Sequence, residues 1–214
     1  ALRRASLSIL RILIQGSIFL NLSKLFEYAV GQFEVDQLDT NDPGDCLRYV
    51  MDRLRSYYED NGISVQVFRS VETLDLYCPY DIDLRVRAVN RFTSSPICQS
   101  LASTNKRVIN ILSKLEEQPF FERVNQELFD NDFERRLSSE LTAIKHKCNE
   151  MIAQKNYFAA LELVSRLHDP MGAFFEHVMV NSDNEQLRKN RLSLLKSVHS
   201  ELVKVADIGL LAGG

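Results

Sequence analysis

Residues 133–152 read FERRLSSELTAIKHKCNEMI, and this stretch decides the fold of the chain. Its apolar residues recur every three or four positions, which is the repeat of an α-helix with one buried face. A half-buried strand would instead alternate apolar and polar residues. The apolar positions are Phe133, Leu137, Leu141, Ile144, Cys148, Met151 and Ile152. The stretch therefore predicts an amphipathic helix.

The same helical period continues through most of the chain. It predicts helices over residues 157–167 and 187–205. Within residues 63–74, Ser64 can cap a further helix, and no Asn-Gly or Asp-Gly turn offers this segment a partner strand. We therefore predict an all-α fold, built as a helical bundle.

The ends of one helix and the break between two units can also be located. Asp42 can cap a helix whose first residue is Pro43, and Asn61-Gly62 can end it. The clearest interruption of the period is Tyr-Cys-Pro-Tyr at residues 77–80. We therefore predict a short helical unit over residues 1–74 and a larger helical domain over residues 75–214.

The composition excludes several classes of protein. With 214 residues, of which 45% are apolar, the chain can bury a core and is not disordered by composition. Its net charge of -3 excludes a uniformly basic nucleic-acid coat, so any RNA contact must rest on local clusters. Arg11, Gly16 and Asn21 interrupt the most apolar run, which excludes a membrane span there. The helical pattern begins at once, without an initiator Met, so we expect a fragment of a longer protein.

No residue pattern predicts a catalytic or a metal site. The pair His168-Asp169 comes nearest, since a metal phosphohydrolase could complete it with His146 and Asp207. Pro170 follows at once and predicts a helix end, so a surface loop is the preferred interpretation. Walker, Gly-x-Ser-x-Gly and Gly-x-Gly-x-x-Gly motifs are absent. The cysteines form no Cys-x-x-Cys pair, so no zinc knuckle is indicated, and their scattered positions favour a reducing cytoplasm. They are Cys46, Cys78, Cys98 and Cys148.

One candidate binding face lies on the helix predicted around residues 105–115. Its polar members have helical spacings that place them together on one side: Lys106, Arg107, Asn110 and Lys114. Its apolar members lie on the opposite side: Val108, Ile111, Leu112 and Leu115. The helix is therefore expected to be anchored in a core and to present cations and an amide outward.

A second candidate binding face lies near the end of the chain. Ser182 and Glu185 form a Ser-x-x-Glu capping box that predicts a helix start. Arg188 and Arg191 then lie three residues apart on one face, with Asn190 in the same turn. A helix start with arginines suits a polyanion. The alternative interpretation is an ordinary solvated helix face.

Several strings of the sequence resemble one family. Residues 1–14, ALRRASLSILRILI, resemble the helix that follows the HD-like region in the β subunit of bacterial tetrameric glycyl-tRNA synthetase. Further blocks resemble the C-terminal part of the same subunit in the same order: residues 81–89, 105–112, 173–181, 190–195 and 205–208. The chain departs from the family at Met171-Gly172, usually Val-Asp, and at Gly209, commonly a serine. The resemblance covers nearly the whole chain.

The resemblance implies a function in tRNA recognition. The family is an α2β2 class II synthetase whose α subunit holds the glycine and ATP site. Its β subunit ends in an all-helical anticodon-binding domain, which here would be residues 75–214. The chain would then be non-catalytic and without a cofactor of its own, while the whole enzyme uses ATP and Mg²⁺ at the α subunit. Its partners would be glycine tRNA, the α subunit and the remainder of the β subunit, in the cytoplasm, with no membrane and no DNA.

The chemistry of an anticodon is compatible with the two candidate faces. Glycine anticodons present two cytosines in a single-stranded loop, which proteins bind by stacking on flat side chains and by hydrogen bonds to base edges. The predicted tRNA-binding residues are Lys106, Arg107, Asn110, Lys114, Arg188, Asn190 and Arg191. The main alternative is a non-catalytic helical scaffold for protein association. It would be favoured by an apolar patch of Phe174, Phe175, Val178 and Met179, if these side chains are exposed.

Overall fold

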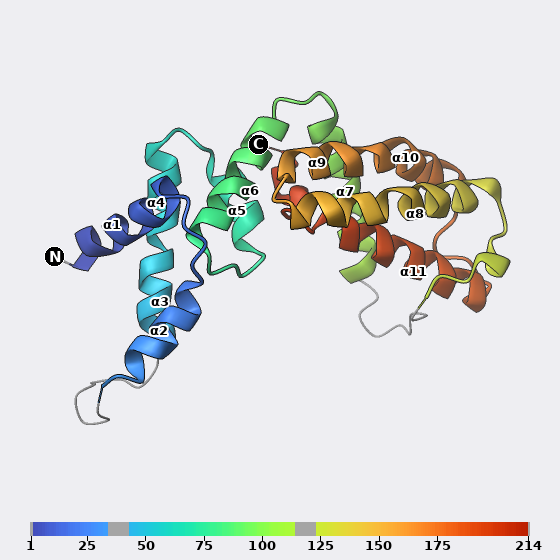
Figure 1. Cartoon of the computed structure of the whole chain (residues 1–214). Helices are drawn as coiled ribbons and strands as arrows, with labels where there is room; N and C mark the ends of the chain where they lie inside the picture. The colour runs from blue at the N-terminus through green and yellow to red at the C-terminus, as the bar shows by residue number, and fades with distance from the viewer. Residues whose placement is uncertain (1, 34–42, 114–122, 214) are drawn as a thin grey trace. The chain divides into compact units, whose positions relative to one another are not determined.

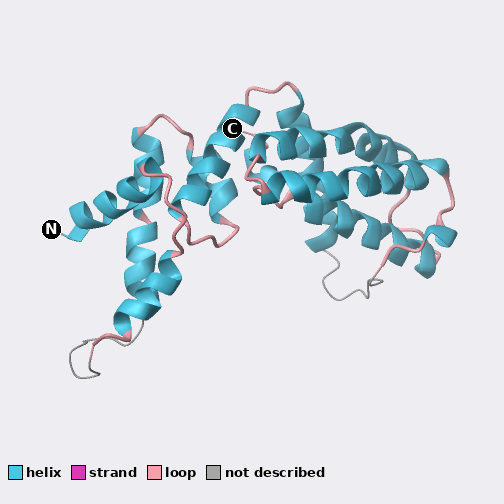
Figure 2. Ribbon diagram, in the orientation of Figure 1, coloured by secondary structure: helices cyan, strands magenta, loops and turns pink. Residues whose placement is uncertain are grey.

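The structure is a computed structural model that describes residues 2–33, 43–113 and 123–213. Every regular element in these ranges is a helix, as Figures 1 and 2 show. The predicted all-α fold is confirmed.

The chain divides into two compact units, residues 1–90 and residues 91–214. The division falls inside helix α6 (Pro79–Phe92), which begins at the third residue of the predicted break, residues 77–80. The sequence placed its boundary earlier, between residues 74 and 75. As a division of function, that boundary stays a prediction.

Unit 1 is a small bundle of short helices. Tyr58 lies at its centre, where its hydroxyl donates to Asp83 at 3.3 Å and its ring packs on Phe68. Burial and the neighbouring Asp83 carboxylate raise the pKa of the Tyr58 hydroxyl above its usual range. Before α6 its helices are α1 (Leu2–Gln15), α2 (Leu22–Val30), α3 (Pro43–Met51), α4 (Arg53–Asp60) and α5 (Val65–Glu72).

The predicted helix ends in unit 1 were correct in part. Ser64 caps α5 as predicted, accepting a hydrogen bond from the Val67 N–H at 3.4 Å. The helix expected from Pro43 to Asp60 is in fact two helices, α3 and α4, and the predicted cap Asp42 lies outside the described residues. The Arg53 guanidinium donates to the Tyr49 carbonyl at 3.4 Å, which is the acceptor that the Arg53 amide would use in an unbroken helix.

Unit 2 is a larger bundle built around α8 (Asp132–Ala153). The apolar face predicted for this helix is its buried face, with Leu137, Ile144 and Cys148 at 0% exposure. In Figure 1, α8 runs alongside α9 and α10, and both helices pack against it. The other elements of unit 2 are α7 (Ile97–Ser113), η2 (Gln126–Leu128), α9 (Tyr157–Val164), η3 (Ser165–Leu167), α10 (His168–His177), α11 (Glu185–Leu202) and η4 (Ile208–Leu211).

Two local predictions in unit 2 were wrong. Pro170 does not end a helix but lies in the first turn of α10, where its missing N–H has no intrahelical partner to lose. Ser182 does not cap α11; the cap is Asn184, whose side chain accepts hydrogen bonds from the amides of Gln186 and Leu187. Ser182 instead accepts from the Asn184 N–H at 3.2 Å.

The N-terminal helix α1 carries three exposed arginines. Arg3, Arg4 and Arg11 form no ion pair with another described residue. No helix in the described ranges is both long enough and apolar enough to span a bilayer.

Candidate nucleic-acid interface

The exposed face of α7 carries the first group of predicted residues. Lys106, Arg107 and Asn110 are exposed, whereas Val108 has 0% exposure and faces the core. The predicted two-sided character of this helix therefore holds in the described part of the chain. Lys114 lies outside the described residues.

A neighbouring helix orients the Arg107 guanidinium. Its central carbon lies 4.3 Å from the ring centroid of Phe175, which comes from α10. This cation–π contact holds the flat guanidinium against the ring and restricts its rotamers. A fixed guanidinium plane on an exposed face can stack on a nucleobase or pair with a phosphate.

The three α7 side chains border a shallow hollow of about 370 Å³ together with Ser103, Ala212 and Gly213. Ser103 lies four residues before Arg107, on the same face of α7, so helical spacing could have revealed it. Ala212 and Gly213 could not be found this way, because the packing of η4 against α7 brings them there from the other end of the sequence. The hollow thus combines two cations, an amide, a hydroxyl and exposed backbone.

The second predicted group, on α11, has internal partners. Arg191 is buried, with 6% exposure, and pairs with the buried Glu134 carboxylate of α8. Its remaining nitrogens donate to the Met179 carbonyl at 3.0 Å and to the Asp130 carboxylate at 3.4 Å. The Arg191 guanidinium therefore joins α11 to the segment before α8 and is not presented to solvent.

Asn190 is likewise turned inward, with 2% exposure. Its side-chain amide donates to the Asn125 carbonyl and accepts from the Asn125 N–H, both at 2.8 Å. Arg188 is half-buried and donates to the Ser182 carbonyl at 3.3 Å. We therefore leave Asn190 and Arg191 out of the proposed interface, because these side chains fix the fold of unit 2.

The arginines of α6 do not enlarge the α7 face either. Arg85 is buried and pairs with Asp81 at 2.9 Å, and Arg87 pairs with Asp83 at 2.6 Å. The Asp83 carboxylate raises the pKa of the Arg87 guanidinium, so this cation is held in its pair. The Arg91 guanidinium lies over the Phe158 ring at 3.7 Å.

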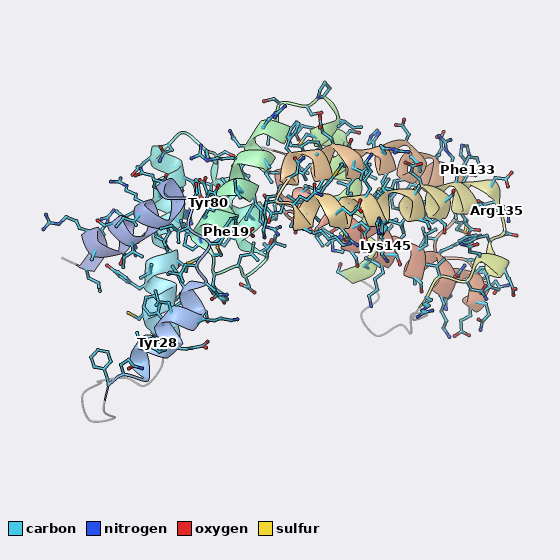
Figure 3. All side chains as sticks on the ribbon, viewed as in Figure 1. Phe19, Tyr28, Tyr80, Phe133, Arg135 and Lys145 are labelled. Atoms are coloured by element: carbon cyan, nitrogen blue, oxygen red, sulfur yellow. The ribbon has the colours of Figure 1, made fainter. Side chains whose placement is uncertain are left out.

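One further group of cations lies on α8. Arg136, Lys145 and Lys147 are exposed on this helix, and Figure 3 labels Lys145. The apolar stripe of α8 already implied that they face outward. Glu140 and Glu150 lie on the same helix and weaken its positive potential.

His168 links α10 to α7. Its Nε2 lies 2.6 Å from the Ser100 hydroxyl, and its Nδ1 lies 2.8 Å from the Asp169 carboxylate. The order of groups is that of a hydrolase triad, but the Asp169 side chain is 83% exposed, whereas the aspartate of a triad is buried. Within the described ranges, no three His, Cys, Asp or Glu side chains are grouped as metal ligands.

The charge of the chain is divided unevenly between the units. Residues 1–90 contain ten Lys and Arg against thirteen Asp and Glu, whereas residues 91–214 contain sixteen of each. The whole excess of negative charge thus belongs to unit 1. A polyanion is repelled least by unit 2, which carries the α7 face.

Comparison with known proteins decides the family. Residues 101–208, half of the chain, match the family described as the DALR anticodon binding domain. The chain belongs to the DALR anticodon binding domain family. The DALR match includes α7 from Leu101 onward, together with α10 and α11, and ends at the first residue of η4. Residues 1–73 match a second family, described as the glycyl-tRNA synthetase beta subunit.

Individual relatives agree with both matches. The DALR-containing chain is 41% identical over 211 residues to the glycine–tRNA ligase beta subunit of Pseudomonas putida strain GB-1. It is 40% identical to that of Pseudomonas fluorescens and 39% identical to that of Azotobacter vinelandii. Each match covers 99% of this chain and 31% of the relative's length. The resemblance predicted from the sequence is confirmed.

Proposed function

We propose that this chain binds the anticodon region of glycine tRNA through the exposed face of α7. It would do so as a tRNA-recognition part of a glycine–tRNA ligase β subunit, in support of ATP-dependent glycylation at the α subunit. The observation that carries the proposal is the exposed group of Lys106, Arg107 and Asn110 within the DALR match. These side chains supply the cations, flat surface and amide that an anticodon loop requires.

Each side chain of the α7 face has a distinct task in this proposal. Lys106, a mobile point charge, meets loop phosphates, which supply affinity but little sequence information. Arg107, held flat against Phe175, stacks on a splayed base. Asn110 offers a donor and an acceptor to a base edge, so it contributes to selectivity for cytosine.

The remaining partners follow from the same proposal. The chain contacts the α subunit and the rest of the β subunit, needs no cofactor of its own and leaves ATP and Mg²⁺ to the α subunit. It binds neither DNA nor membrane. The four cysteines are all free, which supports a reducing compartment, the cytoplasm.

A titration with RNA tests the proposal directly. The chain is titrated with a glycine tRNA anticodon stem-loop and with a copy whose two anticodon cytosines are changed, at two salt concentrations. Tighter, salt-sensitive binding of the unchanged stem-loop is expected. Equal weak binding of both RNAs would show that this chain does not read the anticodon.

Variants of the α7 face assign the binding to its residues. Lys106→Ala should weaken binding about three- to tenfold and lower the salt slope by about 0.7, because a phosphate contact is lost. Arg107→Ala should weaken binding to a similar extent, because stacking on a base is lost. Lys24→Ala and Arg69→Ala remove exposed cations of unit 1 and serve as matched controls. The assignment of RNA binding to the α7 face would be refuted if the control variants weakened binding as much as the α7 variants.

A scaffold for protein association is the second candidate, and unit 1 supports it. Ile12 on α1 and Tyr28 on α2 are 62% and 69% exposed, and Figure 3 shows the labelled Tyr28 at the end of α2. The patch first suggested for such a role is mostly core, because Phe174 and Val178 are buried and only Met179 is largely exposed. Under the scaffold proposal, Ile12→Lys would abolish association with the rest of the synthetase and leave stem-loop binding unchanged.

A further inference from the structure

A hollow of about 310 Å³ opens on unit 1, and its lining residues all lie outside the DALR match. Its walls come from α3, α4, α5, the loop after α5 and the start of α6. Its floor is apolar and well packed, since Leu54, Phe68 and Val71 are no more than 4% exposed. A volume of this size lies near the lower limit of ligand pockets, about 300 Å³, and suits one or two apolar side chains.

The rim of the hollow is acidic. Asp52, Glu72 and Asp75 all border it and are exposed, and none forms an ion pair with another described residue. Among the described residues that line the hollow, the only cation is Arg48, which already pairs with Asp45 at 3.0 Å. Three carboxylates therefore surround an apolar floor without compensating charge.

Local bonds hold the walls of the hollow in place. The Leu22 amide at the start of α2 donates to the Tyr77 carbonyl at 2.8 Å, which fixes the loop after α5. The Thr73 hydroxyl donates to the Ser70 carbonyl at 3.1 Å and closes the end of α5. A hollow with fixed walls loses less entropy when it is occupied.

We propose that this hollow docks a basic segment of a partner protein through an apolar anchor side chain. The anchor would bury its surface on Leu54, Phe68 and Val71, and cations next to it would pair with the three rim carboxylates. RNA does not fit this hollow, because its phosphates would meet uncompensated carboxylates. The inference goes beyond the proposed binding of tRNA and rests on different residues.

Three peptides test the charge and the anchor together. The probe is the hexapeptide Lys-Lys-Leu-Phe-Lys-Lys, which is titrated into the ¹⁵N-labelled chain at low salt. Saturable shifts of the Val71 and Leu76 amides are expected. A twin with glutamates in place of the lysines, and a twin with Ser-Ser in place of Leu-Phe, should each bind at least tenfold more weakly. Equal binding of the three peptides, or no saturable shift, would overturn the proposal.

Rim variants separate this hollow from general attraction to an acidic protein. The triple change Asp52→Asn, Glu72→Gln and Asp75→Asn should weaken binding of the basic peptide about tenfold. The Asp75→Asn change suits the positive φ of 49° at this position, which asparagine tolerates.

The matched control removes the same number of charges away from the hollow. Glu27→Gln, Asp60→Asn and Asp183→Asn are changes at exposed residues that do not border it. An equal loss of binding in the control would show attraction by net charge alone and overturn the docking site. An anticodon stem-loop that displaced the peptide would also overturn it, because the occupant would then be RNA.

Discussion

The cationic turns of α7 and α11 look alike in sequence but serve different purposes in the structure. In α7, Lys106 and Arg107 project from an exposed face. In α11, Arg191 and Asn190 are buried against Glu134 and Asn125. Both turns combine cations with an asparagine, and helical spacing gives each a shared polar face.

The difference between the two turns comes from what packs against them. The α11 turn meets the start of α8, where the buried Glu134 requires a positive partner. The α7 cations Lys106 and Arg107 have no carboxylate partner among the described residues, and Arg107 lies on the aromatic ring of Phe175. A cation can bind a ligand only if it is not already paired inside the fold. Substitutions in the α11 turn should therefore affect mainly stability, whereas substitutions in the α7 turn should affect mainly RNA binding.

The largest effect is expected at Arg191. Arg191→Met should lower the free energy of unfolding by about 3 kcal/mol, because the buried Glu134 carboxylate loses its cation. Urea unfolding measures the change. The double variant Arg191→Met with Glu134→Gln should recover part of the loss, since no buried charge is then left alone. An unchanged unfolding curve for Arg191→Met would mean that α11 and α8 are not joined in this way.

A comparison of two asparagines sharpens the contrast. Asn190→Ala should cost about 1–2 kcal/mol, because the N–H and carbonyl of Asn125 both lose their partner. Asn110→Ala, on the exposed face of α7, should change stability by less than about 0.5 kcal/mol. Thermal unfolding of both variants provides the measurement. Similar costs at the two positions would contradict the inward and outward assignments.

A smaller effect is expected from a conservative change on α7. Arg107→Lys keeps the charge but loses the flat guanidinium that lies on Phe175. We expect stem-loop binding to weaken about threefold with an unchanged salt slope, because stacking is lost and the phosphate charge is kept. Lys106→Arg, which keeps the charge of a phosphate contact, is the control and should bind as before. Unchanged binding of Arg107→Lys would show that Arg107 acts through its positive charge alone and does not stack on a base.

The smallest effect concerns pH. His199 of α11 lies 3.1 Å from the Asn105 side-chain oxygen of α7, and burial lowers the pKa of its imidazole below the usual value despite the opposing effect of Asp207. The unfolded chain therefore takes up this proton first as pH falls, so stability should decrease from about pH 6.5 downward until the folded imidazole is also protonated.

Comparison of two histidines tests this pH dependence. His199→Gln should remove the loss of stability, whereas His146→Gln, at an 88% exposed side chain, should leave it in place. Unfolding measured between pH 5 and pH 8 distinguishes the two variants. A loss that persists in His199→Gln would belong to another group.

The sequence predicted the helices more accurately than it predicted what the polar side chains of those helices contact. The apolar stripes of α8 and α7 placed Leu137, Ile144 and Val108 in the core correctly, because side-chain burial in a helix follows its period. Local capping was less certain: Ser64 was predicted correctly, but Asn184 replaced Ser182 at the start of α11. Adjacent polar residues compete for the same free amides, and local spacing does not rank them.

The sequence by itself determined the helical class, the family and the outward direction of Lys106 and Arg107, because these depend on periodicity and on strings of neighbouring residues. Only the tertiary structure decided that Asn190 and Arg191 are internal, and that Ala212 and Gly213 border the same hollow as Arg107. The acidic rim of Asp52, Glu72 and Asp75 became a single feature only on folding. The physical reason is that desolvation and pairing of a polar group depend on residues brought close by packing, and helical spacing along one segment carries no information about them.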